Sequence, residues 1–236
     1  MSSRSVGSAR AALVLLVLVP ALVLGVGPAA SAGTAEERAQ RRLNQLGCDA
    51  GPADGRLGTW TRTAVIRFQA ANRLQQTGRL TPLTRSRLYA RRQVRCDRRP
   101  VVASGTGRRV VISQRQNYVW LVRADGSVAA QGGLVDNPRV LSPGSYTVGP
   151  KCGRPAKVRM NTDYGGSLWL PHFTRFAPCG VGFHRIPVQK SDGRQIHPDW
   201  MLGTNLKESS GCIRLSARVA SQMWDFAGSG TRVVVR

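Results

Sequence analysis

Acidic residues are scarce in this chain. Its 236 residues include 12 Asp and Glu against 35 Lys and Arg, which gives a formal net charge of +23. The excess is spread along the chain: 15 basic minus 5 acidic residues give +10 over residues 34–99, and 18 minus 7 give +11 over residues 108–236. Such a charge favours polyanionic partners. No helix-turn-helix, zinc-finger or RNA-binding signature is present, so we expect no nucleic-acid partner.

Metal-ligating residues are also few. The chain has 3 His, and no His, Cys, Asp or Glu cluster has ligand spacing, so we predict no metal site and no cofactor. Charged residues make up 20% of the chain and hydrophobic residues 42%. This composition excludes a disordered polar chain and is sufficient for one or two folded domains.

A long apolar stretch occurs near the N-terminus. Residues 11–27 are uncharged and follow Arg4 and Arg10, and an Ala-Ser-Ala sequence ends at Ala32. We predict a signal peptide over residues 1–32 with cleavage after Ala32. An uncleaved anchor is the alternative, although the stretch is short for a span of about 20 residues. We therefore expect a secreted, extracytoplasmic, wall-associated protein with no stable membrane span after cleavage. Its polyanionic partners would be wall polymers, anionic lipid or stem-peptide carboxylates.

Five cysteines remain to be assigned in an exported chain. Pairing within each half gives Cys48–Cys96 and Cys152–Cys179, which an oxidising compartment permits. The sequence alone does not fix this connectivity. Cys212 is left over, and an odd thiol in a secreted protein is either an intermolecular link or a reactive group.

Residues 34–97 are predicted to form a small helical domain. We expect a first helix over residues 34–47, capped by Thr34 with Glu37 three residues later. A second helix is expected to be capped by Thr59, and a third to begin at Thr81 with Pro82 next. The apolar positions expected in the second and third helices are Ala64, Val65, Phe68, Ala71, Leu83, Leu88 and Tyr89.

Residues 36–90 resemble the small three-helix peptidoglycan-binding domain. The motifs that carry the resemblance are Gln40-Arg41-Arg42-Leu43, Asp54-Gly55-Arg56-Leu57-Gly58, Thr61-Arg62-Thr63-Ala64-Val65 and Phe68-Gln69. The resemblance implies binding to cell-wall glycan and stem peptides. A generic helical bundle is the alternative.

After a predicted linker over residues 98–107, the hydrophobic period changes to two. Strands are expected over residues 110–113, 118–123, 128–134, 181–184 and 231–235, with another after the turn at residues 142–145. A single helix is expected over residues 217–226 with Ser216 as its cap. We predict an α+β multidomain chain, in which a three-helix bundle precedes a mostly β, sandwich-like catalytic domain over residues 108–236.

Cys212 is followed by Ile213-Arg214-Leu215 and preceded by Ser209-Ser210-Gly211. Small neighbours let a carbonyl group approach the sulfur, and a turn can aim backbone N–H groups at an oxyanion. A free thiol with a pKa of about 8.5 is mostly protonated near pH 7, and we expect a neighbouring imidazole to take its proton and hold the ion pair. His184 lies near the apolar residues Phe183 and Ile186 at a strand end, whereas we expect surface or packing roles for His172 and His197. The alternative for Cys212 is a buried, hydrophobic thiol.

This second domain resembles the L,D-transpeptidase catalytic domain of the YkuD type. The motifs that carry the resemblance are the opening hairpin, Pro143-Gly144-Ser145-Tyr146, Gly182-Phe183-His184-Arg185-Ile186-Pro187 and Ser209-Ser210-Gly211-Cys212-Ile213-Arg214-Leu215. The resemblance implies that Cys212 is the nucleophile and His184 the general base. It also implies oxyanion donors from the backbone of Gly211 and Cys212, together with Ser210, and an orienting carbonyl at Arg185.

We further expect Arg214, Phe183 and Trp169 to contact substrate, with a structural pairing as the alternative for Arg214. The implied reaction releases D-alanine from a stem peptide, and an amine acceptor then forms a crosslink. With water as acceptor, the same site would be a carboxypeptidase. Ser210 departs from the family motif, which has histidine there, and residues 188–206 form a longer connection. The remaining alternatives are a non-catalytic wall-binding protein, a polyanion binder and a thiol hydrolase of another amide.

Overall fold

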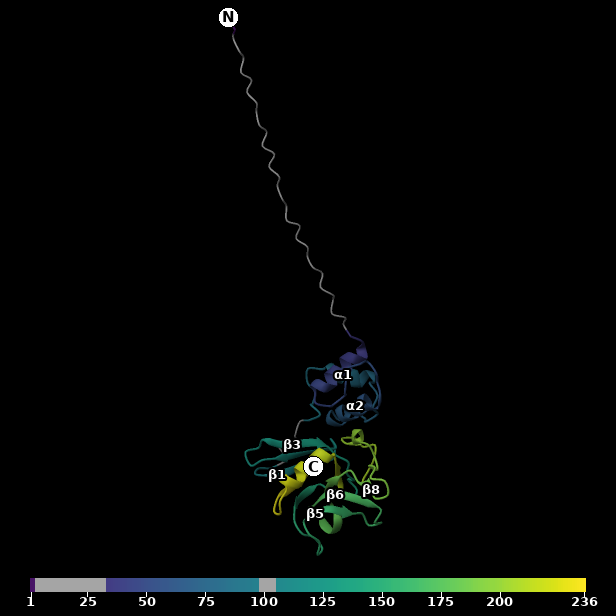
Figure 1. Cartoon of the computed structure of the whole chain (residues 1–236), viewed down its shortest axis with the longest axis vertical. Helices are drawn as coiled ribbons and strands as arrows, with labels where there is room; N and C mark the ends of the chain where they lie inside the picture. The colour runs from purple at the N-terminus through teal and green to yellow at the C-terminus, as the bar shows by residue number, and fades with distance from the viewer. Residues whose placement is uncertain (3–32, 98–104) are drawn as a thin grey trace. The chain divides into compact units, whose positions relative to one another are not determined.

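The computed structural model describes residues 1–2, 33–97 and 105–236 (Figure 1). The predicted signal peptide and most of the predicted linker lie outside the described residues, because residues 3–32 and 98–104 are not among them. In the described part of the chain, no helix has both the length and the apolar character needed to cross a bilayer.

Residues 35–89 contain three helices, α1 (Ala35–Gln45), α2 (Thr59–Ala71) and α3 (Pro82–Tyr89). The predicted capping box of α1 is confirmed: the backbone N–H of Glu37 donates to the Thr34 hydroxyl at 3.1 Å, and the Glu37 carboxylate accepts from the Thr34 N–H. Thr81 caps α3 as predicted. The predicted cap of α2 is wrong by one residue, because Gly58 occupies the N-cap and Thr59 is already helical.

The core of this helical module contains one face of each helix. Every residue of the predicted α2 face is buried, and so is Leu88 of α3. Leu83 and Tyr89, the other apolar residues of α3, are 67% and 53% exposed. α3 therefore presents only one narrow stripe to the core.

Two buried glutamines fasten the loops of the helical module to its helices. In the first, the Gln40 amide nitrogen donates to the Asp54 carboxylate, the Arg56 carbonyl and the Thr61 hydroxyl, each at 3.0 Å. Its amide oxygen accepts from the Gly55 N–H at 2.8 Å. One side chain thus fixes the turn between α1 and α2.

Gln69 repeats this arrangement one helix later. Its nitrogen donates to the Thr77 hydroxyl, the Arg79 carbonyl and the Thr84 hydroxyl at 3.0–3.1 Å, and its oxygen accepts from the Gly78 N–H at 3.0 Å. The amide groups of Gln40 and Gln69 are therefore both fully bonded, as buried polar groups must be to avoid a desolvation penalty.

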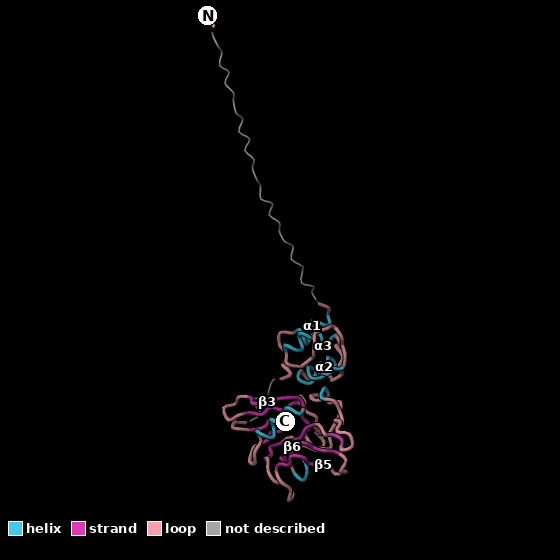
Figure 2. Tube along the Cα trace, viewed as in Figure 1, coloured by secondary structure: helices cyan, strands magenta, loops and turns pink. Residues whose placement is uncertain are grey.

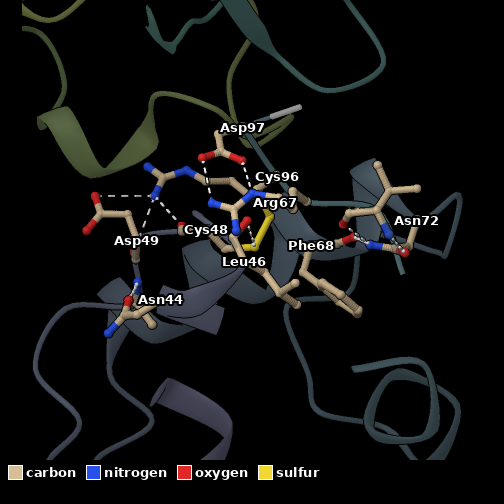
Figure 3. Close-up of a disulfide and its surroundings, with 12 residues drawn as sticks. Asn44, Leu46, Cys48, Asp49, Arg67, Phe68, Asn72, Cys96 and Asp97 are labelled. Carbon is tan, nitrogen blue, oxygen red and sulfur yellow. Dashed lines mark hydrogen bonds and ion pairs between the residues drawn. A yellow bond between two sulfur atoms is a disulfide. The ribbon is translucent and has the colours of Figure 1, made fainter. Parts of the chain in front are cut away.

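A disulfide closes the helical module. Cys48 and Cys96 are bonded, with their Cα atoms 5.0 Å apart, as the pairing within the first half predicts (Figure 3). Beside it, the Arg67 guanidinium donates to the Cys48 carbonyl at 3.0 Å and lies 3.7 Å from the Asp49 carboxylate. The loop after α1 is thus held by one covalent bond and one cation.

The remaining described residues form two sheets (Figure 2). The first has the strand order β3-β2-β1-β10-β4, and the second has the order β5-β6-β7-β9, with β8 paired to β6. The strands are β1 (Arg109–Ser113), β2 (Tyr118–Val122), β3 (Val128–Gly133), β4 (Gly144–Thr147), β5 (Lys157–Thr162), β6 (Leu168–Arg175), β7 (Gly182–Arg185), β8 (Val188–Gln189), β9 (Ile213–Leu215) and β10 (Arg232–Val235).

A single hydrophobic core joins the two sheets and α4 (Ala217–Phe226). Val110 of β1 and Val233 of β10 contribute from the first sheet, Ile213 from the second, and Met223 from α4. The predicted Ser216 cap is present, since its hydroxyl accepts from the N–H of the third helical residue. The predicted fold class, a three-helix module followed by a sandwich-like β domain, is confirmed.

Candidate active site

The predicted nucleophile and base lie on neighbouring strands. β7 and β9 run parallel, with Phe183 opposite Ile213 and His184 opposite Arg214, and Cys212 directly precedes β9. The side chains of Phe183 and Ile213 point into the core. Because side chains alternate along a strand, Cys212, His184 and Arg214 share the opposite face of the sheet. All three line one cavity of about 660 Å³.

Cys212 is the one free cysteine among the described residues, and it is partly buried. Its thiol donates to the carbonyl oxygen of Gly180 at 3.3 Å. Burial raises the pKa of Cys212, while the backbone amide of Gly182 and the cations Arg214 and Arg175 act in the opposite direction. Because burial outweighs these groups, the sulfur rests in its protonated form.

The His184 imidazole is held from two sides. Its Nδ1 lies 2.5 Å from the carbonyl oxygen of Arg185, and its ring stacks on Phe173 with centroids 6.0 Å apart. A carbonyl only accepts hydrogen bonds, so Nδ1 carries the proton and Nε2 is left as the basic nitrogen. The pKa of His184 is lowered to about 4, mainly by burial and to a smaller extent by nearby Arg214, while the hydrogen bond to the Arg185 carbonyl acts in the opposite direction.

The resting charge state of Cys212 and His184 differs from the sequence-based expectation. That expectation was an imidazole that takes the thiol proton and holds an ion pair. In the structure, burial disfavours the charged form of both groups, so one cavity of the free protein holds a neutral thiol and a neutral base.

The turn before Cys212 requires glycine. Gly211 has φ = +126°, and a Cβ atom there would lie 2.7 Å from the Val140 side chain. The Gly211 N–H donates to the Ser209 hydroxyl at 3.0 Å. Ser209 is itself fixed by Asn137, whose side chain donates to the Ser209 carbonyl at 2.8 Å. The backbone of the nucleophile turn is therefore anchored before any substrate arrives.

A second hollow occurs on the helical module. It has a volume of about 320 Å³, and three of its lining residues are the cations Arg62, Arg79 and Arg85. Leu57 and Val65 supply apolar surface in the same hollow. The combination suits a ligand that has both anionic and apolar parts.

Comparison with known proteins identifies both modules. Residues 107–235 match the family model for the L,D-transpeptidase catalytic domain (YkuD), and residues 33–88 match a model for a peptidoglycan-binding domain (PG_binding_1). The chain belongs to the L,D-transpeptidase family. No curated protein sequence matches it.

One solved structure supports the fold. The L,D-transpeptidase from Xylanimonas cellulosilytica (residues 123–326) aligns with a TM-score of 0.52 at 22% identity, over 86% of this chain and 94% of that one. An L,D-transpeptidase from Stackebrandtia nassauensis aligns with a TM-score of 0.47 at 20% identity, over 86% and 91% of the two chains.

Several predicted residues occupy the L,D-transpeptidase cavity and others do not. Ser210, which is exposed, lines it together with Cys212, His184 and Arg214. Phe183 was expected to contact substrate, but it is fully buried in the core and stacks on Phe176 with centroids 4.4 Å apart. The structure therefore does not place Phe183 within reach of a ligand.

The remaining candidates lie outside the cavity lining. Trp169 was also expected at the substrate, but it packs under Lys190, whose Nζ lies 4.1 Å from the ring centroid. His172 lies near Trp224, and the Nδ1 of His197 lies 3.1 Å from the Pro198 carbonyl. The packing roles expected for these two histidines agree with their contacts.

The predicted Cys152–Cys179 disulfide is present and has a place at the cavity. Cys179 is a lining residue, and the next residue, Gly180, accepts the thiol hydrogen bond. Sequence reasoning missed Arg175, which also lines the cavity. Its only signal was a charge at the end of an aromatic stretch, and its position depends on the pairing of β6 with β7.

Proposed function

We propose that the protein is a cysteine L,D-transpeptidase that crosslinks peptidoglycan stem peptides. The observation that carries this proposal is the shared cavity of Cys212 and His184, with Nδ1 of His184 fixed by the Arg185 carbonyl. A nucleophile beside an oriented base is the arrangement that covalent acyl transfer requires.

In the first half-reaction, Sγ of Cys212 attacks the carbonyl carbon of a diamino acid residue, and the thiol proton passes to Nε2 of His184. The bond from that carbon to the D-alanine nitrogen breaks. The departing nitrogen takes the proton from His184, so free D-alanine leaves and a thioester remains. In the second half, an amine of another stem attacks the thioester, and its proton returns to the sulfur through His184.

The developing oxyanion needs donors from the nucleophile turn. The Gly211 N–H, which donates to the Ser209 hydroxyl in the free protein, exchanges that partner for the oxyanion, and the Ser210 backbone lies beside it. Each such donor contributes about 10²–10³ in rate. The Ser209 hydroxyl thus keeps the donor oriented until substrate binds.

The low basicity of His184 suits a general base that acts only during attack. With a pKa of about 4, the imidazole is neutral over the physiological range and is therefore ready to accept a proton. No preformed ion pair is needed.

The helical module supplies wall affinity in this proposal. Its hollow, lined by Arg62, Arg79 and Arg85, suits the carboxylates of stem peptides. Extracytoplasmic action is supported by two disulfides, which persist in oxidising compartments.

The test incubates the full chain with purified tetrapeptide stems and assigns the products by mass. We expect a crosslinked dimer and one free D-alanine per bond formed, and neither product with C212A. Shortened stems without dimers would identify a carboxypeptidase. Dimers formed equally well by C212A would reject the proposal, provided that circular dichroism shows both proteins folded.

A further inference from the structure

Arg175 is a buried cation on the catalytic face of the second sheet. It ends β6 and lies opposite Gly182 of β7, two positions before His184. Directly opposed residues of antiparallel strands share a face, so Arg175 lies on the same side as His184 and Cys212. Only 1% of Arg175 is exposed, yet it lines the cavity.

The guanidinium of Arg175 is incompletely satisfied. Its Nε donates to the Pro155 carbonyl at 3.2 Å, and its Cζ lies 4.8 Å from the centroid of the Phe173 ring. Its Nη1 is buried and has no hydrogen-bond partner among the described residues. A buried donor without a partner is costly, so its retention indicates a role in binding.

Among the described residues, no carboxylate forms an ion pair with this guanidinium. Burial lowers the pKa of Arg175, as does the neighbouring cation Arg154, whereas Cys212 and Tyr164 act in the opposite direction. Asp163 is the only acid among the described residues that line the cavity. Its carboxylate already accepts from the Leu168 N–H at 2.8 Å. The cavity thus holds more positive charge than its own residues neutralise.

We propose that Arg175 is the specificity-determining residue that binds the terminal carboxylate of the acyl-donor stem. This inference rests on the proposed transpeptidase function. In a donor that ends in D-alanine, the carboxylate is separated from the scissile nitrogen by one Cα atom. It therefore reaches only the immediate surroundings of Cys212, where Nη1 of Arg175 lacks a partner. A charge-assisted bond from guanidinium to carboxylate satisfies both groups.

The consequence is a preference for the end of the stem. A donor with one more residue carries its carboxylate roughly 3.5 Å farther from the sulfur, beyond a directly bonded pair. Release of D-alanine also removes the carboxylate from Arg175, so the guanidinium is free again before the acceptor arrives. The same residue thereby separates donor from acceptor.

The test measures thioester formation on the full chain by intact mass, as kcat/KM. Two donors are compared, a stem tetrapeptide with a free terminal carboxylate and the same peptide as its C-terminal amide. For wild type we expect the acid to react on the order of 10- to 100-fold faster, the range of a lost hydrogen bond to a charged group. With R175Q, the acid should slow by this factor, the amide should be nearly unchanged, and the ratio should approach one.

R154Q is the matched control, because it removes the same charge from an exposed position of the same cavity. It should keep the acid-to-amide ratio of wild type. If circular dichroism shows that R175Q does not fold, the acid-to-amide ratios of wild type and R175K still test the inference. We expect R175K to keep part of the preference for the acid.

Three results would overturn the inference. Wild type acylated equally by both donors contradicts it while leaving the proposed function intact. If R175Q slows acylation by both donors equally and shifts the alkaline limb of the pH–rate profile of acylation, Arg175 acts on the ionisation of the thiol instead. No acylation by either donor would reject the proposed function, and this inference with it.

Discussion

In the helical module the amides of Gln40 and Gln69 are buried and bonded at every position, whereas in the catalytic cavity Arg175 keeps an unpartnered nitrogen. The same cavity holds Cys212 and His184 in the neutral forms that burial favours. Complete bonding makes a rigid structural unit. Incomplete bonding costs stability and leaves capacity that a substrate can use. The contrast separates residues that maintain the fold from residues that await a ligand.

The largest effect is expected when the base, His184, is replaced. We expect H184A to lower the rate of Cys212 acylation by about 10²–10⁴, because the thiol then has no nitrogen to take its proton. H172N is the control, since His172 lies outside the cavity and asparagine tolerates its positive φ of 56°. Rapid mixing and quenching, followed by intact-protein mass spectrometry, measures the acylation rate of both variants. Comparable acylation by H184A and H172N would contradict the role of His184.

Lowering the pH should reveal the free-energy cost of burying His184 in its neutral form. Its pKa is about 4 in the folded state and about 6.5 when unfolded, so between these values the unfolded chain binds a proton that the folded chain does not. The free energy of unfolding should therefore fall as the pH drops from 6.5 to 4. The total is on the order of 3 kcal/mol.

H184N lacks this proton and should lose less stability over the same range. Urea unfolding at several pH values between 7 and 4 compares the two proteins, with His172 and His197 present in both. Parallel curves for the two would show that His184 does not titrate as its burial requires.

Replacing a fully hydrogen-bonded glutamine with alanine should destabilise the helical module without changing the rate of Cys212 acylation. Q40A leaves the Gly55 N–H without its partner and removes three further hydrogen bonds of the loop, so we expect a loss of about 2–3 kcal/mol in unfolding free energy. The exposed Gln75 provides the control, since Q75A should stay within about 0.5 kcal/mol. Acylation by a free stem peptide should be the same in all three proteins. A loss of acylation in folded Q40A would undo the separation between the two modules.

The smallest expected effect concerns a helix cap. T34A removes the hydroxyl that accepts from the Glu37 N–H and should cost about 1 kcal/mol. T34S keeps that hydroxyl and should match wild type. Thermal unfolding followed at a helix wavelength compares the three, and equal midpoints for T34A and T34S would show that the cap contributes nothing.

Local signals in the sequence were sufficient for much of the fold. Thr34, Thr81 and Ser216 were identified as caps because a capping side chain acts on residues three positions away. Thr59 failed because Gly58, which has no side chain to signal its position, caps the helix instead. β5 was missed although Val158 and Met160 alternate with polar residues; it has only these two apolar residues, and none of its residues is buried.

The site was predictable only as far as its motifs reach. Cys212 and His184 were found because each lies in a recognisable motif. Phe183 was misplaced at the substrate because it adjoins His184 in sequence, although neighbours on a strand face opposite ways. Arg175 could not be found, because its place depends on the register of β6 against β7, a pairing between segments that the sequence does not align.

The central claim is that Cys212 becomes acylated by the donor stem while His184 acts as a neutral base. Trapping the reaction in acid, digesting the chain and sequencing its peptides by mass locates the acyl group. The account predicts one thioester on Cys212, with a mass equal to the donor minus D-alanine, formed by wild type and much more slowly by H184A. An unmodified Cys212 in protein that has consumed donor, or an acyl group on another residue, would contradict it.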